Sequence, residues 1–402
     1  MMSKKSPQLR FEGFTDDWEE RKLRDLLNKN SEKNKNLSVI NVESVSNKTG
    51  FTKQTEQFED YSVASADLSN YYVIREKQFA YNPSRINVGS IAYKDLGDEI
   101  SVVSPLYVSF STKKVLNDGF LWNWFKTASF DAQRQRLSEG GVRDTLSFNQ
   151  LSEMNTMFPT YPEQETIGSF FKQLDETIAL HQRKLELLKE QKKGFLQKMF
   201  PKNGAKVPEL RFAGFADDWE ESKLGDVLSE RNDQMPETNE YPLMSFVQGK
   251  GVTPKGERYN RSFLVKDSEK KYKKTELGDF IYSSNNLETG SIGFNRTGKA
   301  VISPVYSIFK SKKSRESQFI GIMSARKDFI SKMVRFRQGV VYGQWRIHES
   351  DFLNIDMKMP NDKEQQLIIS FFENIDKTIA LQQRKLDLLK EQKKGFLQKM
   401  FV

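Results

Sequence analysis

The sequence predicts a mixed α/β (α+β) protein built as an internal repeat, and three observations support this prediction. Two framework segments occur twice at a spacing of 201 residues, each copy ends in a long heptad pattern, and β-rich and helical stretches lie between. The copies are residues 7–27 with 208–228, and 174–200 with 375–401, with 15 of 21 and 23 of 27 positions identical. We therefore expect two related units around a pseudo-twofold axis rather than a short-period solenoid.

The end of each copy has apolar residues at alternating spacings of three and four, which is typical of a coiled-coil seam. The pattern runs from Ile167 to Met199 and again from Ile368 to Met400. A helix of about 36 residues would be ~54 Å long, and a lone one would expose its apolar stripe. We therefore expect the two helices to form an antiparallel coiled coil, with His181 as a polar seam residue rather than a metal ligand.

The repeat also predicts how the chain is organised. Between the framework segments, two stretches of equal length have drifted apart in sequence, as expected of a duplicated scaffold that carries two different binding modules. The expected segments are 1–27, 28–158, 159–200, 201–228, 229–359 and 360–402, of which 28–158 and 229–359 are the modules and 159–200 and 360–402 the helices.

Weak similarities remain between the two modules. SPLYVSF at 104–110 matches SPVYSIF at 303–309, and we also pair VGSIAY at 88–93 with LGDFIY at 277–282. The run 316–338 has the composition of a helix, whereas 100–110 and 300–309 are rich in β-branched and aromatic residues.

Composition limits the classes of function. Lys and Arg number 63 against 54 acidic residues, a net charge of +9, which favours a polyanion partner, nucleic acid first. The absence of Cys excludes disulfides, thiolate zinc sites and cysteine nucleophiles, and fits a reducing cytoplasm. Neither a signal peptide nor a membrane span is visible, so we expect a cytoplasmic protein without a membrane partner.

Two partial motif matches do not indicate a phosphate-binding or catalytic site. GFNRTGKA at 293–300 has the spacing of a phosphate loop, but Ala300 replaces the Ser or Thr that binds magnesium and a β-rich run follows, so we interpret it as a hairpin turn. YNPS at 81–84 lacks the second Pro and the aromatic residue of amino-methylating enzymes. Because other catalytic motifs are absent too, we expect no catalytic residue and no metal site.

The modules contain turn-like segments in which amide, Arg and aromatic residues gather, as in proteins that read base edges in the major groove. Lysine clusters such as KKYKK at 270–274 suit phosphate contacts, which position a protein without specifying sequence. An ordinary structural or solvated role remains the alternative for each single residue. The DNA-binding candidates are Tyr81, Asn82, Arg85 and Arg143 in the first module, and Asn285, Asn286, Tyr342, Gln344 and Arg346 in the second.

The chain resembles the specificity subunit of type I restriction-modification enzymes. The resemblance is carried by LRFEGFTDDWEERKLRDLL and its twin, by the two long helical repeats with their Glu163-Gln164 and Glu364-Gln365 openings, and by the diverged intervals. It covers essentially the whole chain. It implies two target-recognition domains separated by an antiparallel helical spacer, each reading one half of a split, asymmetric site in double-stranded DNA.

The resemblance also implies partners. Two modification subunits would dock on the repeated regions, hold S-adenosylmethionine and methylate an adenine in each half-site, and restriction subunits would use ATP and Mg²⁺ to cut DNA. This chain would itself hold no cofactor, since base flipping and methyl transfer belong to the partner. A different class of function remains open: an orphan DNA-binding or scaffold protein without an enzymatic partner.

Overall fold

The computed structural model describes residues 6–54, 67–138, 145–202, 204–247, 249–254, 270–340 and 344–402. The chain divides into two compact units, a first unit of Met1–Gln182 with Arg384–Val402 and a second unit of Arg183–Gln383. The divisions fall inside the two long helices, so each unit contains one half of each helix. The spatial units therefore differ from the sequence repeats, because the end of the chain belongs to the unit that contains its beginning.

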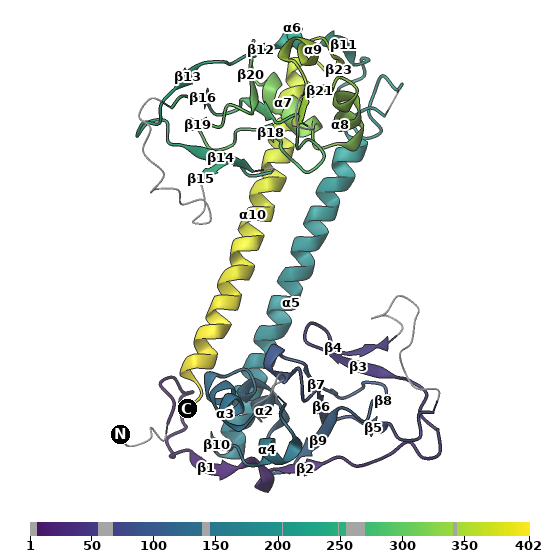
Figure 1. Ribbon diagram of the computed structural model, residues 1–402, viewed down its shortest axis with the longest axis vertical. Coiled ribbons are helices and arrows are strands. Elements are labelled where there is room, and N and C mark those ends of the chain that lie inside the picture. Colours follow the sequence, from purple (N-terminus) through teal and green to yellow (C-terminus); the bar gives the residue numbers. More distant parts are fainter. Residues whose placement is uncertain are drawn as a thin grey trace. The chain divides into compact units, whose positions relative to one another are not determined.

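The first unit combines short strands with short helices (Figure 1). Its strands are β1 (Glu19–Lys22), β2 (Leu27–Lys29), β3 (Glu43–Ser46), β4 (Gly50–Lys53), β5 (Tyr72–Ile74), β6 (Gln78–Tyr81), β7 (Ile91–Tyr93), β8 (Ser101–Val103), β9 (Val108–Thr112) and β10 (Asn155–Phe158). Its helices are η1 (Leu23–Asp25), η2 (Ile86–Val88), α2 (Asp118–Trp124), α3 (Ala128–Leu137), α4 (Phe148–Ser152) and the first part of α5 (Tyr161–Lys198).

An antiparallel sheet in the order β2-β9-β6-β7 organises the first unit. Alternation along the strands places Phe79 and Phe110 on one face, where their rings stack with centroids 5.1 Å apart. This face packs against Phe120 and Trp124 of α2 to form the main core. The hairpin β3–β4 and the pair β5–β8 form smaller sheets.

The second unit repeats this plan. Its strands are β11 (Glu220–Lys223), β12 (Leu228–Glu230), β13 (Gln234–Met235), β14 (Met244–Val247), β15 (Gly251–Pro254), β16 (Tyr272–Thr275), β17 (Phe280–Tyr282), β18 (Ile292–Phe294), β19 (Ala300–Ile302), β20 (Ser307–Ser311), β21 (Gln338–Val340), β22 (Gln344–Arg346) and β23 (Asp356–Met359). Its helices are α6 (Leu224–Val227), α7 (Glu316–Met323), α8 (Lys327–Val334), α9 (Glu349–Leu353) and the first part of α10 (Asp362–Lys399).

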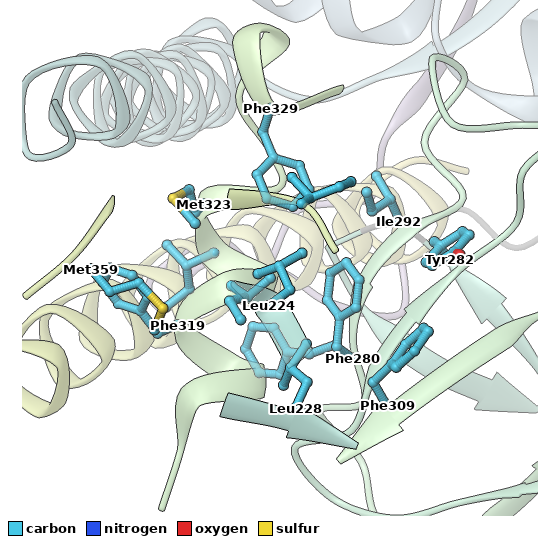
Figure 2. Close-up of a cluster of buried hydrophobic side chains, with 14 of the residues drawn as sticks. Leu224, Leu228, Phe280, Tyr282, Ile292, Phe309, Phe319, Met323, Phe329 and Met359 are labelled. Atoms are coloured by element: carbon cyan, nitrogen blue, oxygen red, sulfur yellow. The ribbon is translucent and has the colours of Figure 1, made fainter. Parts of the chain in front are cut away.

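The sheet of the second unit has the equivalent order β12-β20-β17-β18. Its core gathers Phe280 and Phe309 from the sheet with Leu224 of α6 and Phe319 of α7, all fully buried (Figure 2). Strand β17 therefore corresponds to β6, β18 to β7 and β20 to β9, and the two modules are built on the same scaffold.

The repeated N-terminal segments fasten each module to its long helix. Arg10 makes a bidentate ion pair with Glu163 at 2.7 Å, and Arg211 does the same with Glu364 at 2.8 Å. Both carboxylates are buried, and such forked pairs fix direction as well as distance. The segments then enter strands β1 and β11, which pair antiparallel with β10 and β23 just before the long helices begin.

Helices α5 and α10 run antiparallel within each unit, as the heptad pattern predicts. In the first unit Phe170 contacts Phe396 at 5.1 Å between ring centroids, and further along α5 Asp175 pairs with Lys393. In the second unit the same contacts recur with the helices exchanged, between Phe195 and Phe371 at 4.9 Å and between Lys192 and Asp376 at 2.5 Å. The lysines at the seam thus have carboxylate partners on the facing helix.

Three local predictions need correction. The stretch 316–338 is not one helix: α7 ends at Met323 and α8 starts at Lys327, because Arg326 adopts an extended backbone and its guanidinium pairs with Asp328. The phosphate-loop look-alike is a connection rather than a hairpin turn, since β18 and β19 belong to different sheets. VGSIAY at 88–93 leads into β7, so its structural counterpart is 289–294, which leads into β18, and not 277–282.

Candidate nucleic-acid interface

The candidate residues that the structure describes come together in each module where a central strand of the main sheet, β6 or β17, ends. We call this end of the strands the sheet edge. In the first unit the turn 82–90 follows β6, and in the second the turn 283–291 follows β17. The two turns share their backbone hydrogen bonds: Asn82 N donates to Ser90 O at 3.0 Å, and Ser283 N donates to Ser291 O at 2.8 Å. The segments AYNPSR and SSNNLETG, chosen separately from the sequence, are therefore the same turn in two diverged copies.

A second chain segment joins each turn from far along the sequence. Leu146 N donates to Pro83 O at 3.1 Å in the first unit, and Ile347 N donates to Ser284 Oγ at 3.0 Å in the second. Asn285 Oδ1 also accepts a hydrogen bond from Trp345 N at 2.6 Å. The second unit thus brings Asn285 and Asn286 beside the strand that carries Arg346.

Tyr81 is placed differently from the other candidates, because its side chain is fully buried. Its hydroxyl donates to Leu146 O at 3.0 Å, and burial raises the pKa of this phenol. Tyr282 makes the equivalent bond to Ile347 O at 3.4 Å. Both tyrosines point into the core, where each hydroxyl binds a backbone carbonyl of the second segment. They therefore hold this segment beside the turn from inside the module.

The exposed groups of the edge are Arg85, Asn285, Asn286 and Arg346, with Asn82 half-buried. Asn82 uses Oδ1 to accept from Ser84 N at 3.0 Å, which holds the start of the turn. Within the described parts of the chain, no carboxylate pairs with Arg85. An exposed guanidinium has the chemistry to bind phosphate or a guanine edge.

Arg346 is held loosely by a nearby carboxylate. Its Nη2 lies 3.5 Å from Glu349 Oε2, and Glu349 Oε1 accepts from Ser307 Oγ at 2.9 Å. Burial raises the pKa of Glu349, but the hydrogen bonds from backbone N–H and from Ser307 outweigh it, so the pKa lies below its usual range. An ionised Glu349 can orient Arg346 while half of the arginine side chain stays exposed.

A further ion pair supports the second turn. Arg337 is largely buried and binds both carboxylate oxygens of Glu288, at 2.7 and 2.6 Å, and this contact lowers the pKa of Glu288. Because Glu288 lies within the turn 283–291, the pair fixes the turn against the chain that follows α8.

Three candidates remain outside this account. Arg143 and Tyr342 lie outside the described residues, and of Gln344 only the backbone, in β22, is described. Their proposed roles stay predictions.

The lysine cluster at 270–274 is less available for phosphate contacts than its sequence suggests. Lys273 is buried in β16, and Lys274 pairs with Glu276 at 3.0 Å and lies 4.7 Å from the Tyr241 ring centroid. Lys270 and Lys271 stay exposed. The bounds of the strand explain the difference, since Lys270 and Lys271 precede β16 whereas Lys273 and Lys274 lie inside it.

Sequence reasoning missed Trp345, although it names residues on both sides of it. This indole is 48% exposed at the sheet edge, next to Asn285. An aromatic residue between Gln344 and Arg346 in an otherwise polar segment was the available signal, because an exposed ring in such a place can stack on a base or sugar.

In the chain as described here, no group of three or more His, Asp or Glu side chains could hold a metal ion. Nor does any described helix combine the length and the apolar character that crossing a membrane requires.

Comparisons with known proteins agree with this architecture. A family model for the type I restriction modification DNA specificity domain matches residues 15–190 and again 216–391. The MjaVIII type I restriction enzyme specificity subunit of Methanocaldococcus jannaschii is 21% identical over 358 residues, covering 82% of this chain and 81% of that protein.

Two solved structures share the fold. The type I restriction-modification S subunit from M. genitalium superposes with a TM-score of 0.60 at 14% identity, covering 99% of both chains. A chain from work on complex assembly and conformational transition of the type I R-M system gives 0.53 at 14% identity, covering 97% of this chain and 99% of that one. With two matched copies spanning most of its length, the chain belongs to the family of type I restriction-modification DNA specificity domains, whose members are non-catalytic DNA-recognition subunits.

Proposed function

We propose that the chain reads a split, asymmetric site in double-stranded DNA, with the edge of each module facing one half-site. The observation that carries this proposal is the pair of equivalent turns on one scaffold. They keep the same backbone hydrogen bonds, yet one presents Arg85 where the other presents Asn286. Arginine favours guanine and asparagine favours adenine, so two different half-sites follow.

The partners follow from the family. Two modification subunits dock on the repeated framework, hold S-adenosylmethionine and methylate an adenine in each half-site, and restriction subunits add ATP- and Mg²⁺-dependent cleavage in the cytoplasm. The paired helices separate the modules and set the number of unread base pairs. Lys and Arg contacts to phosphate supply most of the affinity, and therefore a steep salt dependence.

Single-molecule sequencing of native DNA tests the proposal. N6-methyladenine is mapped in cells with the gene, without it, and with residues 28–158 or 229–359 exchanged for those of another member of the family. We expect a split motif whose methylation disappears with the gene and of which one half changes with each exchange. An unchanged methylome would instead favour an orphan DNA-binding scaffold, which salt-dependent binding of the purified chain would then identify.

A further inference from the structure

Each unit exposes an apolar side chain at the tip of an equivalent tight turn. Leu106 is 80% exposed and Val305 is 66% exposed. Both follow a proline in a Ser-Pro-apolar-Tyr turn, closed by Tyr107 N donating to Ser104 O at 3.0 Å and by Tyr306 N donating to Ser303 O at 3.2 Å. Proline fixes the backbone in front of the tip, so the apolar side chain is presented by a stiff support.

Strand pairing places these tips at the candidate interface. Tyr81 at the end of β6 pairs with Val108 at the start of β9, and Tyr282 at the end of β17 pairs with Ser307 at the start of β20. In an antiparallel pair, the turn after one strand and the turn before its neighbour emerge at the same edge. Leu106 thus lies at the edge that carries Arg85, and Val305 at the edge that carries Asn285.

A cavity confirms this proximity in the first unit. It has a volume of about 290 Å³, and its lining includes Pro83 from the turn 82–90, Leu106 from the tip, and Thr145, whose neighbour Leu146 bonds to that turn. The tip and the turn 82–90 therefore border one depression on one surface.

Folding alone does not account for the exposed tips. A single exposed apolar residue needs no explanation, but the modules have diverged and both keep the tip. The tyrosine that follows each tip packs against a small apolar cluster, whereas Leu106 and Val305 extend away from the protein. The stabilising residue of the turn is therefore the tyrosine, which leaves the tip itself for a contact outside the chain.

We infer that Leu106 and Val305 are apolar wedges that press into the base stack of duplex DNA, one in each half-site. This inference rests on the proposed function and adds a mode of DNA contact to it. An uncharged branched side chain gains nothing from phosphate, but it can enter a base step and offset the loss of stacking there. Extrusion of a base for methylation needs such local unstacking. Leucine is longer than valine, so the first half-site should be distorted more.

The experiment uses the full chain assembled with its modification subunits, and duplexes that carry 2-aminopurine beside the methylated adenine of one half-site. In Leu106→Ser we expect the 2-aminopurine fluorescence rise and the methylation rate to fall about tenfold at the first half-site only. Val305→Ser should give a smaller loss at the second half-site only. Leu106→Met keeps an apolar tip and should keep the signal.

Two leucines provide matched controls. Leu96 and Leu277 are 65% and 64% exposed, but they follow β7 and precede β17, which places them at the opposite edge of each sheet. Leu96→Ser and Leu277→Ser should leave both signals unchanged, and the melting temperatures of all variants should match the wild type because every tip is exposed.

Several outcomes would overturn the inference. If Leu106→Ser behaves like Leu96→Ser while the wild type binds and methylates its site, the wedge is wrong and the proposed function stands. If uracil in place of thymine reproduces the loss, the tip contacts a thymine methyl group instead of wedging. If the wild-type complex binds no split site at all, the proposed function fails and this inference fails with it.

Discussion

The two units differ most where a partner would touch them and least where the long helices begin. At the framework, Arg10 with Glu163 and Arg211 with Glu364 form the same buried pair. At the sheet edge, the same turn presents Arg85 in one unit and Asn286 in the other. The difference teaches that the scaffold fixes where a residue is presented, while the residue itself is free to change. Under the proposed function, the recognised half-site changes with that residue.

Loss of the buried framework ion pair should destabilise both units to the same extent. Arg10→Ala and Arg211→Ala each leave a buried carboxylate without its partner, so each should lower the free energy of unfolding by about 3–5 kcal/mol. Urea unfolding followed by tryptophan fluorescence measures this. Arg21→Ala is the control, because its pair with Glu19 is exposed and should contribute less than about 1 kcal/mol. Equal losses in all three variants would contradict the comparison.

Substitutions at one sheet edge should affect the recognition of one half-site only. Gln344→Ala or Arg346→Ala should weaken discrimination at the second half-site, and Arg85→Ala at the first, by about 1–3 kcal/mol per lost contact. Competition binding with duplexes mutated in one half-site gives these values. Weakening of both half-sites to the same extent by one substitution would show that the residue contacts phosphate rather than bases.

The buried tyrosines sharpen the comparison further. Tyr81→Phe removes a hydrogen bond of 3.0 Å and Tyr282→Phe one of 3.4 Å. Each variant leaves a carbonyl without its donor, so we expect a loss of stability of about 1 kcal/mol for Tyr81→Phe and less for Tyr282→Phe. Thermal unfolding monitored by circular dichroism distinguishes them. A larger effect in the second unit would contradict the ranking by distance.

The smallest expected effect is a pH dependence confined to the first unit. Partial desolvation of its ammonium, with Lys393 nearby, lowers the pKa of Lys126 to about 8 even though the side chain is 29% exposed, while the structurally equivalent residue of the second unit is Ala325. Between pH 8 and about 10.5 the unfolded chain binds more protons than the native one, so the wild type gains stability as pH rises. Any stability advantage of Lys126→Met should be greatest below pH 8 and shrink above it. Unfolding across pH 7 to 10 measures this difference, and Lys172→Met, an exposed lysine paired with Asp95, is the control.

The fold was predictable where the sequence repeats and less so inside the modules. The framework helices follow from heptad spacing and from near identity between the copies. The equivalence of the two turns was hidden, because it depends on pairing strands whose residues lie 27 apart in the chain, such as Tyr81 with Val108. The segments were found from their composition, but which residue faces outward depends on what packs against each strand. Phe79, Ala80 and Tyr81 are all buried in β6, whereas Trp345 and Arg346 are both exposed in β22.

The division of the chain inside its long helices has a consequence for synthesis on the ribosome. The second unit is one continuous stretch, Arg183–Gln383, and can fold as soon as it has left the exit tunnel. The first unit buries Met400 and Phe401 in its core and takes a backbone hydrogen bond from Leu9 N to Lys399 O at 2.9 Å. Nascent domains usually fold in the order of translation. Here the first unit needs residues 384–402, which are translated only after the whole second unit, so the unit that begins first completes its core second.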